Sequence, residues 1–273
     1  MKKQLLIALA LVLGAFSAKA FTLDTLKVAT THLETPGDII VVTPDAAKAN
    51  PAMHFPTVYI LHGYDGNYRT WLDITSPDLP RLADEYNMIF VFPDGRDSWY
   101  FDAPADPNLQ MESYFTKDLV PFVDKHYPTL ATPDQRAITG LSMGGHGSLW
   151  LALRHPDIWG NAGSMSGGVD IRPFPKSWKL PQRLGDKESN PQVWEDHTVI
   201  NLVPRAKDAG VNITFDCGSD DFFYDVNNNL HRALLEAGVP HDYTSRPGNH
   251  SHKYWRNSIL YHLLFFSRNF NKD

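Results

Sequence analysis

Cysteine is almost absent from this sequence of 273 residues: Cys217 is the only one, so no disulfide bond can form within the chain. Cys and His do not occur together at the spacings typical of a metal site, and we expect neither a metal nor an organic cofactor. Internal repeats, low-complexity tracts and linkers rich in Pro, Gly and Ser are missing as well. Stability must therefore come from a hydrophobic core, and we expect one domain over residues 21–273, which is long enough to bury one.

Long hydrophobic runs are missing except near the amino end. Two lysines precede an apolar run from Leu5 to Phe16, and Ala18-Lys19-Ala20 then supplies small residues suited to cleavage. This pattern predicts a secretory signal peptide over residues 1–20, which is too short for a membrane span. No later run is long enough to cross a bilayer, and no cysteine near the cleavage point suits a lipid anchor. We expect export after cleavage near Ala20, to the periplasm or as a secreted protein, without membrane insertion.

Positive charge is also scarce. The formal net charge is −6, and it becomes −9 once Lys2, Lys3 and Lys19 are removed with the signal peptide. An acidic surface is a poor match for nucleic acid or anionic lipid, because like charges repel. We therefore expect no nucleic-acid partner.

The mature chain alternates short apolar runs with amphipathic segments. Such alternation predicts an α/β fold with a mainly parallel central sheet and helices on both faces. In sheets of this kind, ligands bind outside the carboxyl ends of the strands. The expected strands are 39–42, 57–61, 88–92, 136–139, 213–216 and 241–244, and the expected helices are 114–126, 148–154, 226–237 and 253–270.

One segment interrupts this rhythm. Residues 168–203 are rich in proline, aromatic and charged residues, and they show no clear period. A long irregular insertion in a small domain is usually functional or mobile. We expect it to lie over the site and to place Trp178 there; a surface excursion without function is the alternative.

A possible nucleophile lies in Gly140-Leu141-Ser142-Met143-Gly144, between an expected strand and an expected helix. In a nucleophile elbow, the serine has a strained backbone, and the flanking glycines let strand and helix approach closely. The helix N-terminus beneath the serine favours negative charge developing nearby. The alternative is a glycine-rich turn with an incidental serine.

A serine nucleophile needs a base, and the base needs an acid to orient it. In this type of fold the order along the chain is serine, acid, histidine. Two downstream loops fit that order. Asp216, Asp220 and Asp221 lie in or just after one expected strand, and His250 and His252 lie just before the last helix.

At this point the sequence resembles the esterase D-like "putative esterase" family of α/β-hydrolases, which includes tributyrin, feruloyl and acetyl-xylan esterases, S-formylglutathione hydrolases and mycolyltransferases. The likeness extends over nearly all the mature chain and implies the α/β-hydrolase fold. The motifs that carry it are Leu61-His62-Gly63-Tyr64-Asp65-Gly66-Asn67, Phe92-Pro93-Asp94-Gly95, Ser98-Trp99-Tyr100, the elbow through Gly145, His155-Pro156-Asp157, Cys217-Gly218-Ser219-Asp220-Asp221-Phe222 and residues 248–255.

The resemblance implies a catalytic triad of Ser142, Asp221 and His250. Asp220 is the second candidate for the acid, and Asp216, on the strand itself, is expected to be structural. His252 stands where relatives often have tryptophan, so the choice of base between the two histidines stays open.

The resemblance also implies an oxyanion hole formed by the backbone N–H groups of Tyr64 and Met143. Trp99 and Tyr100 are candidates to flank the acyl or alcohol site, with packing as the alternative. His252 and Trp178 are further candidates for substrate binding. We expect His146 and His155 to cap or pack rather than to catalyse.

These observations predict a serine carboxylic-ester hydrolase that acts through an acyl-enzyme. The expected substrate is a small-molecule or polysaccharide-linked ester that carries a short acyl, acetyl or feruloyl group. The alternatives are an acyltransferase of the mycolyltransferase type, an S-formylglutathione hydrolase-like thioesterase and, with less support, a non-catalytic binding protein. A signal peptide argues against the thioesterase, whose substrate is cytosolic, and the presence of all three triad residues argues against the binding protein.

Overall fold

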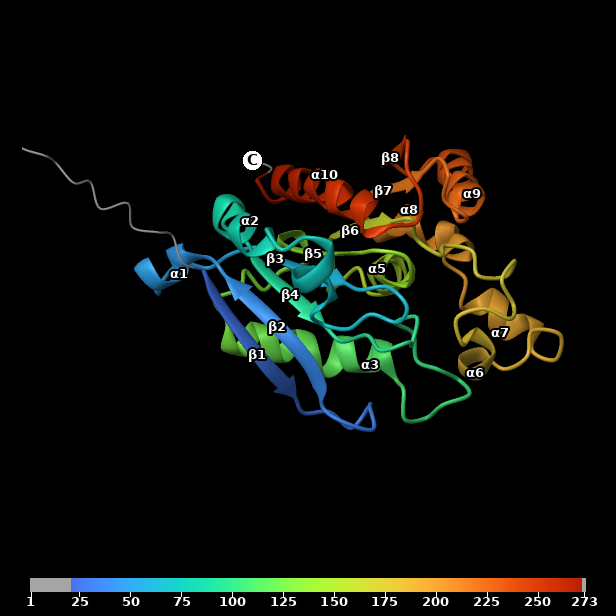
Figure 1. The fold of residues 1–273 in the computed structure, drawn as a ribbon, viewed down its shortest axis with the longest axis horizontal. Coiled ribbons are helices and arrows are strands. Elements are labelled where there is room, and N and C mark those ends of the chain that lie inside the picture. The colour runs from blue at the N-terminus through green and yellow to red at the C-terminus, as the bar shows by residue number, and fades with distance from the viewer. Residues whose placement is uncertain (1–20, 272–273) are drawn as a thin grey trace, which may run out of the picture.

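An eight-stranded sheet forms the centre of the computed structural model, which describes residues 21–271 (Figure 1). The strand order is β1-β2-β4-β3-β5-β6-β7-β8. The pairs β1·β2 and β2·β4 are antiparallel, and all the others are parallel. The strands are β1 Thr22–Val28, β2 Gly37–Thr43, β3 Thr57–Leu61, β4 Ile89–Pro93, β5 Arg136–Gly140, β6 Asn161–Met165, β7 Asn212–Gly218 and β8 His241–Arg246. The expected signal peptide, residues 1–20, lies outside the described residues.

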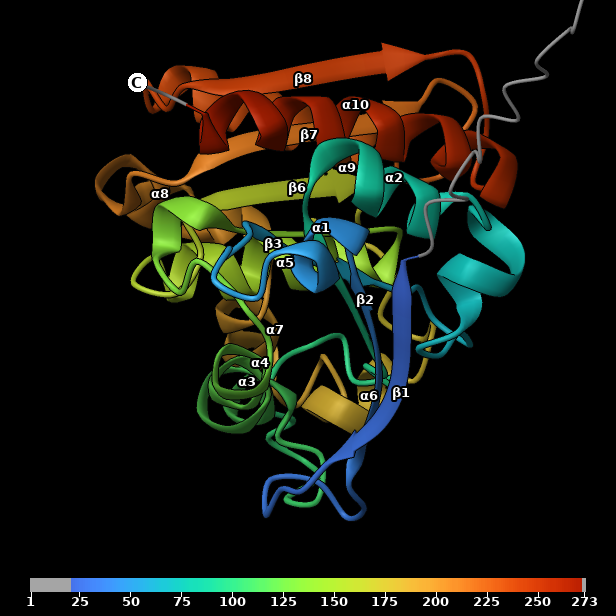
Figure 2. The same ribbon diagram turned by 90° about the vertical axis from the view of Figure 1, so that its left-hand side faces the viewer.

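Helices cover both faces of the sheet, as the sequence predicts for an α/β-hydrolase fold (Figures 1 and 2). Side chains of the central strands alternate between two cores: Tyr59 packs toward α5 (Met143–Arg154), whereas Val58 and Ile60 pack toward α10 (His252–Phe270). The elements on the α10 side are η1 Trp71–Thr75, α2 Leu79–Tyr86 and α10 His252–Phe270. Those on the α5 side include α3 Met111–Tyr114, η2 Phe115–Leu119, α4 Val120–His126, α5 Met143–Arg154, α8 Val203–Ala209 and α9 Tyr224–Glu236. A further helix, α1, spans Asp45–Ala49, and a short helix, η3, spans Pro133–Gln135.

Two strands were not expected from the sequence. In β1, an edge strand, six of the seven residues are exposed or half-buried, so the strand lacks an apolar run. In β6, small residues replace large apolar ones, because neighbouring side chains come close to the backbone. A Cβ atom on Gly163 would lie 2.4 Å from His262 Nδ1 and 2.7 Å from Thr139 Oγ1. Neither strand therefore shows the apolar pattern from which strands are predicted.

The insertion at 168–203 contains more regular structure than its sequence suggests. It forms α6 Leu180–Leu184, α7 Pro191–Asp196 and the short helix η4 Val199–Leu202. Trp194 is fully buried, and Arg183 forms ion pairs with Asp97 and Asp106. The expectation of an irregular segment was therefore wrong in part: these helices are too short to show a period, but they are anchored to the rest of the fold.

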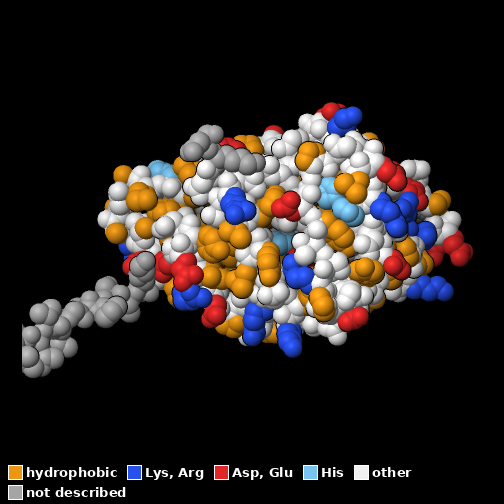
Figure 3. Space-filling model, turned by 90° about the horizontal axis from the view of Figure 1, so that it is seen from above, with side chains coloured by type: hydrophobic (Ala, Val, Ile, Leu, Met, Phe, Trp, Pro, Cys, Tyr) orange, Lys and Arg blue, Asp and Glu red, His pale blue; other side chains and the backbone are white. Residues whose placement is uncertain are grey.

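No helix in the described range 21–271 is long and apolar enough to cross a bilayer. Figure 3 shows the face that includes α10, where hydrophobic side chains are interspersed with charged side chains of both signs. Leu260, Tyr261 and Leu264 are exposed on α10. The excess of acidic over basic side chains is thus not concentrated in one patch on this face.

Candidate active site

Ser142 lies at the turn between β5 and α5, with φ = 56° and ψ = −116°. A positive φ is strained for a residue with a side chain, and such strain is typical of functional turns. Glycines on either side make this turn possible. A Cβ atom on Gly144 would lie 2.6 Å from the carbonyl oxygen of His62, and one on Gly140 would lie 2.6 Å from backbone atoms of Gly144. The turn therefore has the geometry of a nucleophile elbow.

Three side chains from the ends of three strands form a hydrogen-bonded row. Ser142 follows β5, Asp221 follows β7 and His250 follows β8. The Nε2 atom of His250 lies 2.8 Å from the Oγ of Ser142, and its Nδ1 atom lies 2.8 Å from Asp221 Oδ2. With Nδ1–H donating to the carboxylate, Nε2 is free to accept the serine proton. This is the arrangement that nucleophilic catalysis by serine requires.

The imidazole of His250 is held by its surroundings as well as by Asp221. Phe222 lies against it with a centroid separation of 4.2 Å, and Trp255 meets it edge-on at 4.8 Å. The side chain of Asp221 is fully buried, and its Oδ1 also accepts a hydrogen bond from the N–H of Phe223 at 2.8 Å. Asp221 is therefore oriented by its own turn before it contacts the histidine.

Two backbone N–H groups close to Ser142 are available as donors. The N–H of Ser142 donates to Met165 and that of Gly144 donates to Leu141, at 2.9 and 2.7 Å. Within residues 21–271, the N–H groups of Met143 and Tyr64 have no acceptor. Met143 lies at the start of α5 and Tyr64 lines the cavity above Ser142. Both can donate to a negative oxygen, as in an oxyanion hole.

The loop that carries Tyr64 is held by hydrogen bonds of the buried residues His62 and Tyr100. His62 is buried; its Nδ1–H donates to Gly63 O at 2.7 Å, and its Nε2 accepts from Gly95 N–H at 2.8 Å. The Tyr100 hydroxyl donates to the His62 carbonyl oxygen at 2.9 Å. These contacts hold the end of β3 in one conformation.

A cavity of about 480 Å³ opens over Ser142. Trp178 and His252 line it, as the sequence predicts for substrate-binding candidates. Trp99 and Tyr100 do not, and that expectation was wrong: both are buried, Tyr100 beneath the end of β3 and Trp99 beside His146. The other lining residues are Gly63, Tyr64, Asp65, Gly66, Thr70, Ile74, Leu141, Ser142, Phe222, His250 and Trp255.

Several residues that line or support the cavity were not predicted from the sequence. Ile74 is 54% exposed at the edge of the cavity, and the turn that carries it is attached to α10. Thr75 Oγ1 lies 2.8 Å from His252 Nδ1, and Arg256 donates to the carbonyl oxygens of Ile74 and Thr75. Phe222 also lines the cavity, and its position next to Asp221, the candidate acid, is the signal in the sequence that could have indicated it.

The other acids and histidines are used differently. Asp220 is exposed, and its carboxylate has no hydrogen bond to His250 among the described contacts. Asp216 accepts hydrogen bonds from Ser258 at 2.8 Å and from His262 at 3.0 Å, and it forms an ion pair with Arg246. This buried network joins β7 to α10, a structural role.

His146 is fully buried, with its Nδ1–H donating to Gly168 O at 3.1 Å. Burial lowers the pKa of His146 to about 3, so the ring is neutral over the physiological range. Its neighbours are aromatic: Trp99 meets it edge-on and Trp150 is stacked with it. His146 therefore packs, as expected.

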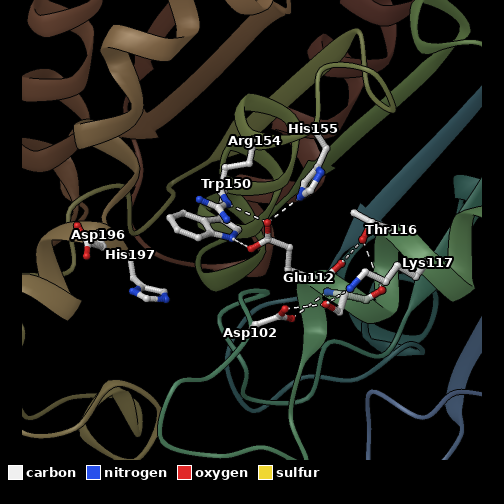
Figure 4. Close-up of a pocket in the computed structure, with 10 residues that line it drawn as sticks. Asp102, Glu112, Thr116, Lys117, Trp150, Arg154, His155, Asp196 and His197 are labelled. Carbon is white, nitrogen blue, oxygen red and sulfur yellow. Dashed lines mark hydrogen bonds and ion pairs between the residues drawn. The ribbon is translucent and has the colours of Figure 1, made fainter.

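A separate group of polar side chains around Glu112 lies away from Ser142, between α3 and α5 (Figure 4). Glu112 accepts hydrogen bonds there from Trp150 at 2.9 Å, Arg154 at 2.8 Å and His155 at 2.6 Å. Burial raises the pKa of Glu112, but the hydrogen bonds from His155 and Arg154 outweigh it, so the pKa is lowered. His155 thus ties the end of α5 to α3. Across the described residues, no group of three or more His, Cys, Asp and Glu is arranged to hold a metal ion.

The fold and this site define the class of protein, an α/β-hydrolase. The chain belongs to the family described as "Putative esterase", whose sequence profile matches residues 30–266. It is 28% identical over 221 residues to an acetyl esterase of Caldicellulosiruptor saccharolyticus, covering 74% of this chain and 80% of that protein.

One solved structure agrees with this assignment, and a second shares the fold. A ferulic acid esterase is 26% identical to the chain with a TM-score of 0.79, covering 93% of this chain and 99% of that one. An S-formylglutathione hydrolase from Staphylococcus aureus has a TM-score of 0.79 at 22% identity, covering 92% of this chain and 100% of that one. At this lower identity, the likeness concerns the fold. Together the family and its relatives make the protein a hydrolase of the esterase type.

Proposed function

We propose that the protein is an exported serine esterase in which Ser142 is the nucleophile, His250 the general base and Asp221 the orienting acid. The observation that carries this proposal is the 2.8 Å separation between Ser142 Oγ and His250 Nε2, at a strained turn. Neither a metal nor a cofactor is needed for this chemistry.

The reaction proceeds in two halves. Ser142 Oγ attacks the ester carbonyl carbon while His250 accepts the hydroxyl proton, and the resulting imidazolium is stabilised by Asp221. His250 then gives that proton to the leaving alcohol oxygen as the C–O bond breaks, which leaves an acyl-serine. A water molecule, deprotonated by His250, attacks the acyl carbon, and the proton returns to Ser142 as the carboxylic acid departs.

The N–H groups of Met143 and Tyr64 stabilise the tetrahedral oxyanion in both halves. A donor of this kind acts on charge that exists only near the transition state, so it lowers the barrier without tightening substrate binding. One such hydrogen bond contributes on the order of 3 kcal/mol.

The substrate class we propose is a neutral ester with a short acyl, acetyl or feruloyl group on a carbohydrate or small alcohol. The relatives named an acetyl esterase and a ferulic acid esterase support it. The cavity supports it too: its described lining contains one carboxylate, that of Asp65, and no Lys or Arg. A leaving group with carboxylates, such as glutathione, would find no cation there.

The proposal is tested with a panel of p-nitrophenyl acetate and butyrate and methyl ferulate, assayed with wild type and Ser142→Ala. The wild type is expected to hydrolyse the esters, and kcat of the variant is expected to fall by about 10⁴-fold or more, because only the oxyanion hole and binding remain. Circular dichroism should show an unchanged fold. Activity within a few-fold of wild type in Ser142→Ala would exclude Ser142 as the nucleophile.

Export is a separate part of the proposal, and it rests on the sequence of residues 1–20. The full chain is expressed in a bacterium with its amino end intact, and the product is recovered from the periplasm or medium. Mass spectrometry is expected to show a mature chain that begins at Phe21. A full-length chain found only inside the cell would contradict export and cleavage of the signal peptide.

A further inference from the structure

A second polar cavity, of about 410 Å³, lies beside the candidate active site and is separated from it by the loop that carries His250. Alternate residues of this loop face different cavities: His250 and His252 line the one over Ser142, whereas Asn249, Ser251 and Lys253 line the other. The loop after β7 divides in the same way, with Phe222 on one side and Asp220 on the other. The complete lining of the second cavity is Asp220, Pro247, Gly248, Asn249, Ser251, Lys253, Tyr254 and Asn257.

Four polar side chains of this cavity have no partner within the described part of the protein. Asp220, Asn249, Lys253 and Asn257 are exposed, and in the described part of the chain their side chains have neither a hydrogen bond nor an ion pair. One cavity is therefore lined by a carboxylate, two amides and an ammonium group that make no hydrogen bond within the described residues. Together they supply both donors and acceptors.

The chemistry of the lining indicates a neutral ligand with several hydroxyl groups. The one negative charge of Asp220 is matched by the one positive charge of Lys253, so neither an anion nor a cation is favoured. Hydroxyl groups both donate and accept, as amides and carboxylates require. Pro247, which is exposed, adds an apolar surface against which the C–H face of a sugar can pack.

We propose that this cavity is a sugar-binding subsite that holds a unit of an acylated oligosaccharide or polysaccharide remote from the scissile ester. This inference rests on the proposed esterase function, because it extends the substrate from Ser142. The leaving alcohol must lie near His250 Nε2 to receive its proton, so the alcohol part of the substrate extends on the side of the His250 loop. A single acylated sugar would occupy the cavity over Ser142, and only a longer chain would pass the loop and reach Asn257.

The test compares two esters with the same acyl group and the same attachment: an O-acetylated methyl xyloside and an O-acetylated xylotetraose. Wild type is expected to favour the tetraose in kcat/KM. In Lys253→Ala/Asn257→Ala this preference is expected to fall about tenfold or more, because two side chains that can form hydrogen bonds with the remote sugar unit are removed.

The matched control is Asp242→Ala/Arg268→Ala, which removes two exposed charged side chains from the groove between β8 and α10. It is expected to keep the wild-type preference. A wild type with no preference for the tetraose, or a preference that survives in Lys253→Ala/Asn257→Ala, would overturn the subsite.

Direct binding separates this inference from the proposed function. Unacylated xylotetraose is titrated into Ser142→Ala by calorimetry, with no catalysis involved. Binding that weakens about tenfold when Lys253→Ala and Asn257→Ala are added supports the subsite. Binding that is absent, or that the two substitutions leave unchanged, contradicts the subsite. Neither result bears on the nucleophile, which is tested by the ester hydrolysis assay of Ser142→Ala.

Discussion

Asp221 and His250 form a pair in which the acid is fully buried and the histidine is 16% exposed. Both carboxylate oxygens lie close to Nδ1 of the imidazole, Oδ2 at 2.8 Å and Oδ1 at 3.0 Å. The pair holds Nε2 toward Ser142 and defines the tautomer. The neighbouring Asp220 makes no such contact, although it occupies the adjacent position in the sequence.

This difference predicts distinct effects of removing the two charges. Asp221→Asn is expected to lower kcat on p-nitrophenyl acetate by about 10⁴-fold, because an amide cannot hold the required tautomer or stabilise the imidazolium. Asp220→Asn is expected to cause a loss of a few-fold at most. A larger loss of kcat in Asp220→Asn than in Asp221→Asn, measured under saturating substrate, would show that Asp220 is the acid.

His252 is predicted to influence acyl selectivity rather than the chemical steps. His252→Trp removes the contact with Thr75 and fills part of the cavity beside Ile74. The ratio of kcat/KM for p-nitrophenyl butyrate to that for the acetate is expected to fall about tenfold, a typical effect of a small change in pocket volume. His126→Trp, at an exposed position on α4, is the control. Loss of activity on every ester would contradict a role of His252 that is confined to selectivity.

His146 predicts a dependence of stability on pH. Its pKa is lowered by burial from 6.5 to about 3 in the folded protein, so below pH 6.5 the unfolded chain binds a proton that the folded chain does not. Its contribution to stability is therefore complete above pH 6.5 and is lost as the pH falls, by about 1.4 kcal/mol per pH unit.

The measurement is urea unfolding of wild type and His146→Phe at pH 7.5 and 5.0. Between these values, the free energy of unfolding of wild type relative to the variant is expected to fall by about 2 kcal/mol. The exposed substitution His126→Phe serves as the reference. A difference that does not change with pH would mean that the pKa of His146 is the same in the folded and unfolded chains, and would contradict the shift.

Glu112 is predicted to stabilise the contact between α3 and α5. Glu112→Gln removes the charge that Arg154 and His155 share, and the loss of stability is expected to be about 1–3 kcal/mol. Glu85→Gln removes one partner of an exposed ion pair with Arg81, and it is expected to change the stability by less than about 1 kcal/mol. Thermal unfolding at pH 7 distinguishes the two. Because the pKa of Glu112 is lowered, the difference between wild type and Glu112→Gln should shrink as the pH falls through that pKa.

Much of the fold was predictable from local patterns. The parallel strands β3, β4, β5 and β7 are short apolar runs, and their helices show a clear period, so their order indicates an α/β sheet. The strands β1 and β6 were not predictable, because one is a polar edge strand and the other consists of small residues that make room for His262 and Thr139. The helices of the insertion were missed because each spans only about one turn.

The sequence by itself determined the elbow, because only glycine at positions 140 and 144 lets strand and helix approach as closely as they do. It also determined the order of serine, acid and histidine, since each follows a strand. Only the tertiary structure decided which of two adjacent aspartates meets His250, and which aromatic residues face the cavity. Tyr100 and Trp99 are buried while Trp178 and Phe222 line the site, because that choice depends on packing between segments far apart in the chain.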